Sequence, residues 1–253
     1  MRTLIVGAGT MGRWFAELTA EWVDPIFLDS DEQKARKTAR EFGGSAHIET
    51  DVDSVPIVCT AVPLSVTPAI IREYAPVANR AVIDLSGAMK APTEAMRSHA
   101  PDCERISLHP LFAPENAPGN VAVVAEEIGP VWGRLSNSLE LAGNDVFETS
   151  AETHDRAMET VQAKVHAAVI AYAVAADDID SRFHTPVSAE LSALADMVLS
   201  GNPSVYAEIQ EHFDGAEDVA RAAETIAEAN REDFEDLYRT TAREFQWERD
   251  ERG

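Results

Sequence analysis

The segment TLIVGAGTMG, residues 3–12, constrains the fold more than any other part of the chain. An apolar run leads directly into Gly7, Gly9 and Gly12, which form a G-x-G-x-x-G pattern. Gly7 permits a tight turn, Gly9 lets the backbone approach a pyrophosphate, and Gly12 lets the following helix pack closely on the strand. The pattern predicts a strand, a glycine turn and a helix whose first N–H groups face a phosphate. The residues expected to contact a dinucleotide here are Gly7, Ala8, Gly9, Thr10, Met11 and Gly12.

A second apolar run, PIFLD, ends at Asp29, about twenty residues after the glycine turn. A carboxylate in that position hydrogen-bonds the adenosine ribose hydroxyls and repels a 2′-phosphate, so Asp29 favours NAD over NADP. Val62 and Pro63 follow a later apolar run, and we expect them at the carboxyl edge of the sheet, against the cofactor. Two simpler explanations stay open. The glycine turn could belong to a fold that has lost its nucleotide, and Pro63 could simply end a strand.

Short apolar runs alternate with helix-length segments through the first 150 residues. The runs are TLIV, PIFL, PIVCTA, AVIDLS, RISLH and NVAVVA. Strands separated by helices predict a parallel sheet, and continuously apolar strands predict burial on both faces. The expected fold class is therefore α/β, with a doubly wound, mostly parallel Rossmann sheet in an NAD-binding domain over residues 1–150.

The composition changes near residue 150. Only Gly201, Gly215 and Gly253 remain of the glycines, and stretches rich in Ala, Glu, Val and Met follow, such as DRAMETVQAKVHAAVIAYAVAADDI. These stretches predict helices, one of them largely buried, with Ser150 or Thr153 capping the first. We expect residues 151–253 to form a second, all-α domain.

Two polar residues end apolar strands at the edge where the glycine turn lies. Ser86 follows AVIDL, and His109 ends RISL. A serine there can donate to a substrate or orient a base, although a helix-capping serine is an equally ordinary explanation. A lone histidine is more often structural. On the edge that holds a nicotinamide, however, His109 is a good general base, because its pKa lies near the working pH.

The segment HDRAMETVQAKVH carries a further polar pattern. His154, Met158, Gln162 and His166 recur at intervals of four, so one face of a helix should present all of them. The simpler explanation is a helix face with incidental polar residues. That explanation accounts poorly for Gln162 and His166, because the surrounding residues could be buried and buried polar groups need hydrogen-bond partners.

The charge of the chain restricts its partners. The net charge is −23, with about −9 in residues 1–150 and about −14 beyond, and only four of the basic residues are lysines. An acidic, lysine-poor surface on both halves predicts a halophilic protein, in which salt screens the self-repulsion. The field and the lack of a basic patch disfavour nucleic-acid binding.

The absence of a long apolar run and the two cysteines bear on the cellular compartment of the protein. No apolar run is long enough to span a membrane, and the N-terminus does not resemble a signal peptide. Cys59 and Cys103 form no metal or redox motif, and we predict no metal site. These features favour a cytoplasmic protein with two reduced thiols.

The combination resembles the prephenate dehydrogenase family over about residues 1–215. The matching segments are GAGTMG, Asp29, DLS followed by K and P, HPLFAP, HDRAMETVQAKVH and NPSVYAEIQ. The resemblance implies a Rossmann domain followed by a helical substrate domain that forms a homodimer. It also implies NAD-dependent oxidative decarboxylation of prephenate to 4-hydroxyphenylpyruvate in tyrosine biosynthesis. His109 matches the catalytic base, and Ser86 the serine that orients it and the substrate. His154 matches a cofactor-lining residue, while Gln162 and His166 match the substrate cleft.

Two departures from the family pattern bear on the substrate. The spacing from serine to lysine in DLSGAMK differs from that pattern, and Ala189 stands where an arginine commonly binds a substrate carboxylate. Arg156, Lys164 and Arg182 are candidates to replace that cation. Arogenate therefore stays a possible substrate. Two further classes of protein also stay possible: a different Rossmann dehydrogenase, such as a 3-hydroxyacid dehydrogenase or pyrroline-carboxylate reductase, and a non-catalytic NAD-binding regulator.

Overall fold

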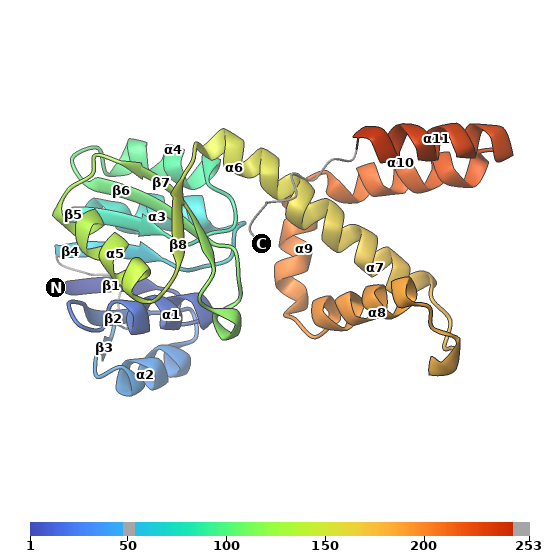
Figure 1. Ribbon diagram of the computed structural model, residues 1–253. Coiled ribbons are helices and arrows are strands. Elements are labelled where there is room, and N and C mark those ends of the chain that lie inside the picture. The colour runs from blue at the N-terminus through green and yellow to red at the C-terminus, as the bar shows by residue number, and fades with distance from the viewer. Residues whose placement is uncertain (48–53, 245–253) are drawn as a thin grey trace.

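A computed structural model describes residues 1–47 and 54–244 of the chain. Its centre is an eight-stranded sheet in the order β3-β2-β1-β4-β5-β6-β7-β8 (Figure 1). The strands are β1 (Arg2–Val6), β2 (Asp24–Leu28), β3 (Ser45–Ala46), β4 (Val55–Thr60), β5 (Ala78–Asp84), β6 (Glu104–Pro110), β7 (Asn120–Glu126) and β8 (Asp145–Glu148). All neighbours run parallel except β6 and β7. The predicted fold class, a mostly parallel Rossmann sheet with a helical region after it, is confirmed.

Helices cover both faces of the sheet because its strands are apolar on both sides. Leu4 and Ile5 of β1 point to opposite faces, and neither is exposed at all. One face packs on α1 (Thr10–Leu18), α2 (Glu32–Glu41) and α5 (Pro130–Leu141). The other packs on α3 (Thr67–Tyr74) and α4 (Lys90–His99). The chain order reverses between β1 and β4, which creates the crevice where such sheets bind ligands.

Every described element after β8 is helical. The α-helices are α6 (Ala151–Met158), α7 (Val165–Ala175), α8 (Pro186–Leu199), α9 (Pro203–His212), α10 (Gly215–Glu228) and α11 (Arg231–Glu244). Ser150 caps α6, as one of the two predicted candidates, by accepting a hydrogen bond from the Thr153 amide at 3.1 Å. Glu159–Lys164 is a π-helix that joins α6 to α7 without a break. Figure 1 shows α10 and α11 lying side by side and extending away from the sheet.

The prediction that one of these helices is largely buried is wrong for the single chain. Only Val169 of α7 is buried, although α7 consists almost entirely of Ala, Val, Ile and Tyr. Val174, Val187 and Met197, on α7 and α8, are 81%, 76% and 67% exposed. Apolar side chains are therefore plentiful here, but the chain itself supplies too few neighbours to cover them. No helix among the described residues is long and apolar enough to cross a membrane.

Candidate active site

The glycine turn after β1 has the conformation that the sequence predicts. Gly7 has a φ of +105°, and a Cβ there would lie 2.1 Å from the Ala61 carbonyl oxygen. A Cβ on Gly12 would lie 2.0 Å from the Gly7 carbonyl oxygen. Both positions therefore exclude any side chain. Gly7 closes the turn against the exit of strand β4, and Gly12 lets α1 lie directly on β1.

The space in front of the turn is open. A Cβ on Gly9 would meet nothing closer than the Lys34 ammonium, 3.7 Å away. Helix α1 begins at Thr10 and continues through Met11, and its N-cap Gly9 provides no side-chain hydrogen bond. The first N–H groups of α1 are thus left for an anion. A dinucleotide pyrophosphate fits this cradle.

Asp29 lies directly after β2 and faces the same turn. Its carboxylate accepts hydrogen bonds from the Ala8 amide at 2.8 Å and the Asp31 amide at 2.9 Å, and pairs with Lys34 at 3.0 Å. Burial opposes ionisation, but the two amides and the Lys34 ammonium lower the pKa of Asp29 below its ordinary value. A fixed carboxylate therefore stands where the adenosine ribose of a dinucleotide would lie.

The β4 exit contributes an apolar wall. A Cβ on Gly7 would lie 3.4 Å from the Val62 side chain, so Val62 borders the glycine turn. Pro63 follows, and its carbonyl oxygen accepts a hydrogen bond from the Thr67 hydroxyl at 3.0 Å. Pro63 thus helps begin α3, while Val62 is the residue of the pair that meets the turn.

His109 occupies the corresponding edge of β6. The strand pairs with β5 on one side and β7 on the other, and His109 is only 9% exposed. Burial, followed by the proximity of His154, lowers the pKa of His109 from 6.5 to about 3, against the opposing effect of Asp155. His109 is consequently a neutral imidazole across the physiological pH range. The expectation that its pKa lies near the working pH is wrong for the protein without substrate, because burial and His154 oppose protonation of the ring.

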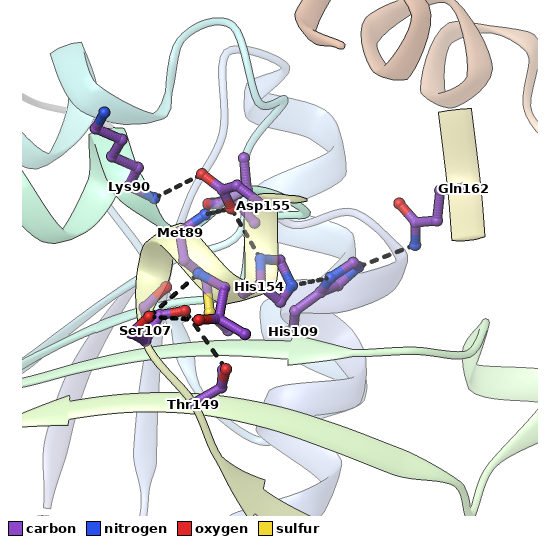
Figure 2. A network of polar contacts seen from close by, with 12 residues as sticks. Met89, Lys90, Ser107, His109, Thr149, His154, Asp155 and Gln162 are labelled. Carbon is purple, nitrogen blue, oxygen red and sulfur yellow. Dashed lines mark hydrogen bonds and ion pairs between the residues drawn. The ribbon is translucent and has the colours of Figure 1, made fainter. Parts of the chain in front are cut away.

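The neighbours of His109 come from α6 and the π-helix (Figure 2). His109 Nδ1 lies 2.9 Å from His154 Nε2, and His154 Nδ1 lies 2.8 Å from Asp155 Oδ1. On the other side of the ring, His109 Nε2 lies 3.5 Å from Gln162 Nε2. A Cβ on Gly87 would lie 3.6 Å from the same Nε2. The structure thus brings His109, His154 and Gln162 together.

The fourth member of the predicted stripe, His166, lies elsewhere. Its ring stacks edge-on against Tyr206, with centroids 4.9 Å apart, and its Nδ1 is buried without a hydrogen-bond partner in the described structure. The intervening π-helix explains the separation, because its wider turn breaks the four-residue repeat between Gln162 and His166. A uniform α-helix was the wrong expectation for this segment.

Among the described residues, the Ser86 hydroxyl hydrogen-bonds groups other than His109, the base that it was expected to orient. Its hydroxyl lies 2.7 Å from Asp84 Oδ2 and 2.8 Å from the Ala88 carbonyl oxygen. Asp84 is fully buried and also accepts hydrogen bonds from Thr60 and Ser107. Burial raises the pKa of Asp84 to about 6, although those hydrogen bonds oppose the rise. Ser86 therefore holds the loop that carries Gly87, and its contact with a substrate stays a prediction.

Sequence reasoning missed Asp84 and Asp155. Asp84 had a visible signal, because it interrupts the apolar run AVIDL just before the strand ends. Asp155 had only its place beside His154, since the groups it binds, the amides of Met89 and Lys90, are more than sixty residues away in the chain.

The three basic residues that could bind a substrate carboxylate differ in whether they already form ion pairs. Lys164 pairs with Asp218 at 2.6 Å, and Arg182 pairs with Asp180 at 2.7 Å. Arg156 is exposed on α6 and forms no ion pair within residues 1–47 and 54–244. Of the three, Arg156 is the one whose charge the described structure leaves available.

The glycine turn, the uncapped α1 and the carboxylate after β2 define a Rossmann-type dinucleotide-binding fold, here followed by a helical region. The chain is 25% identical to the "probable arogenate/prephenate dehydrogenase" of Methanocaldococcus jannaschii over 96% of its length. It is 27% identical to the 4-amino-4-deoxyprephenate dehydrogenase of Streptomyces pristinaespiralis, over 84% of this chain and 77% of that protein. The resemblance to prephenate dehydrogenases that the sequence predicts is thereby confirmed.

A solved structure shows the same fold. Prephenate dehydrogenase from A. aeolicus, in complex with hydroxyphenyl propionate and NAD+, superposes with a TM-score of 0.68 at 16% identity, covering 96% of this chain and 97% of that one. No family model matches the chain. The chain spans 60% of the length of the Methanocaldococcus protein.

Proposed function

We propose that this protein is an NAD-dependent dehydrogenase that oxidatively decarboxylates prephenate to 4-hydroxyphenylpyruvate, in tyrosine biosynthesis. The observation that carries the proposal is a buried His109 on the same sheet edge as the glycine turn. Two relatives whose names include prephenate-type substrates support it. So does the NAD+ in the A. aeolicus complex of the same fold.

The cofactor contacts follow from the geometry of the turn. Backbone amides at the start of α1 would hold the pyrophosphate, and Asp29 would bind the ribose hydroxyls. Val62 borders the turn on the side of the sheet where the nicotinamide would lie. When bound, NAD+ supplies the hydride acceptor for the ring carbon that bears the substrate hydroxyl.

His109 performs the proton transfer in this proposal. Its Nε2 accepts the hydroxyl proton as the carbonyl forms and returns it to the oxygen as the ring becomes aromatic and carbon dioxide leaves. Gln162 lies beside Nε2 and can hydrogen-bond the substrate oxygen or a carboxylate. Burial of His109 excludes water from the transfer, so the proton passes between two fixed partners.

We also assign a separate role to each of the two regions of the chain. Residues 1–150 would bind NAD, and residues 151–253, of which 245–253 lie outside the described residues, would bind substrate and form a homodimer. The exposed apolar side chains of α7 and α8 support the dimer, because a second copy could cover what the single chain leaves open. We further propose that the protein is cytoplasmic and halophilic.

A substrate comparison in molar potassium chloride tests the proposal. Purified protein is mixed with NAD+ and either prephenate, arogenate, 4-amino-4-deoxyprephenate or a 3-hydroxyacid, while NADH absorbance and carbon dioxide release are measured together. We expect prephenate to give the highest kcat/KM, with equal amounts of NADH and carbon dioxide. A preference for arogenate or the amino compound would change the substrate but keep the reaction. NADH without carbon dioxide, or no reduction with any of them, would contradict it.

A further inference from the structure

Asp155 joins two parts of the molecule that meet at His109. Its Oδ1 accepts hydrogen bonds from the Met89 amide at 2.8 Å and from His154 Nδ1 at 2.8 Å. Its Oδ2 accepts a hydrogen bond from the Lys90 amide at 3.1 Å. Figure 2 shows these contacts continuing through His154 to His109. One carboxylate therefore binds both the start of α4 and the histidine pair.

The hydrogen bonds fix the proton positions along this chain of groups. Burial opposes ionisation of Asp155, but its bonds to His154 and the two amides lower the pKa of Asp155, so the group is a carboxylate and only accepts. When both buried imidazoles are neutral, His154 Nδ1 carries the hydrogen, because the carboxylate only accepts, and His154 Nε2 has a free lone pair. His109 Nδ1, 2.9 Å away, donates to that lone pair. The lone pair of His109 is consequently on Nε2, beside Gln162 and Gly87.

The reverse tautomers would leave buried groups without partners. If His154 carried its hydrogen on Nε2, its Nδ1 lone pair would face the Asp155 carboxylate, with no proton between two acceptors. His154 is only 3% exposed, so water could not relieve that repulsion. The hydrogen bond between Asp155 and His154 therefore sets the tautomer of His154 and, through it, the tautomer of His109.

The same carboxylate also replaces a missing helix cap. The N-cap residue of α4, Met89, makes no side-chain capping hydrogen bond, and the first turn of α4 contains no acidic residue. Asp155 supplies the capping hydrogen bonds and the negative charge from outside the helix. Its carboxylate satisfies two N–H groups at the start of α4 and complements the helix dipole. The loop before α4 carries Gly87, where a Cβ would lie 3.6 Å from His109 Nε2. The carboxylate therefore holds the elements on both sides of the imidazole in place.

We propose that Asp155 is a positioning residue that acts through His154 to keep the hydrogen of His109 on Nδ1 and the accepting lone pair on Nε2. This role rests on the proposed function of His109 as the base, but the tautomer itself does not depend on the substrate. Asp155 touches neither substrate nor cofactor in this proposal. It makes His109 ready to accept a proton before the substrate arrives.

Two substitutions separate the tautomer from the negative charge. Asp155→Ala removes the acceptor, so the His154 tautomer loses its bias and α4 loses its cap. Asp155→Asn keeps one acceptor oxygen. We expect that oxygen to take the Oδ1 position, because the Met89 amide is partly buried while the Lys90 amide reaches solvent. The asparagine should then retain the His154 tautomer without the charge. Glu152→Ala, an exposed position on the same helix, is the matched control.

The measurements are imidazole nitrogen NMR shifts of the protein without ligands, and kcat and KM of each variant. In the unmodified protein His109 should show a protonated Nδ1 and a bare Nε2. Asp155→Ala should mix or reverse the two tautomers and lower kcat by about 10²-fold, the lower range for general acid–base catalysis. Its KM for NAD should stay within about twofold, because uniform binding is untouched. Asp155→Asn should recover most of the kcat together with the tautomer, and Glu152→Ala should match the unmodified protein.

Several results would overturn the proposal. A bare Nδ1 on His109 in the unmodified protein would do so directly, even if neither variant folds. Unchanged tautomers and kcat in Asp155→Ala would show that the carboxylate is not needed. An Asp155→Asn variant that keeps the tautomer but loses as much kcat as Asp155→Ala would assign the effect to charge. If the unmodified protein oxidises none of the substrates, the proposed function fails, whereas the NMR result still decides the role of Asp155.

Discussion

Burial of a neutral His109 links the stability of the protein to pH. The imidazole lies beside His154, Gln162 and Gly87, and its pKa is lowered from 6.5 to about 3 by burial and by His154, although Asp155 opposes the shift. Between these values the unfolded chain binds a proton at this position and the folded chain does not. A falling pH therefore favours unfolding, and the stabilisation is complete above about pH 6.5 and lost progressively toward pH 3.

The size of the effect follows from the linkage relation. Each unit of pH inside this window changes the free energy of unfolding by about 1.36 kcal/mol, so a fall from about pH 8 to about pH 4.5 should remove about 2.7 kcal/mol through His109 alone. The figure depends little on the folded-state pKa, because it is set by the distance between the experimental pH and the unfolded pKa. His109→Asn has no proton to bind and should not show this loss.

The assay compares the two proteins rather than interpreting either alone. Urea unfolding in molar potassium chloride at both pH values gives the free energy of unfolding by linear extrapolation. The stability difference between the unmodified protein and His109→Asn should shrink by about 2.7 kcal/mol at the lower pH. His184→Asn, at an exposed position, serves as the control for the loss of an imidazole elsewhere in the chain. The stability difference between the unmodified protein and His109→Asn could instead change by less than about 0.5 kcal/mol between the two pH values, which is the usual scatter of surface substitutions. That result would refute the neutral buried imidazole.

Three further predictions concern the cofactor, the surface charge and the assembly. Asp29→Ser should raise the ratio of kcat/KM for NADP to that for NAD by about tenfold, since about 1.4 kcal/mol of discrimination is lost and Lys34 is left without its carboxylate. An unchanged ratio, or comparable use of both cofactors by the unmodified protein, would contradict the role of Asp29. The melting temperature should rise from low to molar potassium chloride, because salt screens a net charge of −23; a flat or falling melting temperature would refute the halophilic interpretation. Light scattering in high salt should give about twice 27.5 kDa, and a monomer at micromolar concentration would count against the dimer.

Much of the sheet could be predicted because its strands are continuous apolar runs ending at a shared edge. Strands β3 and β8 could not. The first has two residues, and the second, DVFE, has no buried residue to mark it. The switch to a π-helix after Met158 has no Pro or Gly to announce it, so the four-residue repeat extended one step too far, to His166. These features depend on tertiary packing rather than on local pattern.

The candidate site divides in the same way. Gly7, Asp29 and His109 could be found because each is an unusual residue at a strand end. The hydrogen bonds of Ser86 could not, because they depend on Asp84 and the path of the following loop. The contact of Asp155 with α4 joins segments more than sixty residues apart, and a single sequence carries no signal for it.

The central claim is that His109 accepts the proton from the substrate while hydride passes to NAD+. The most direct measurement is the single-turnover rate of NADH formation from prephenate by His109→Asn, with NAD+ binding followed separately by calorimetry. We predict that the rate falls by about 10²–10⁴-fold while the Kd for NAD+ barely changes, because the glycine turn and Asp29 are intact. A folded His109→Asn protein that forms NADH at nearly the unmodified rate would contradict the account.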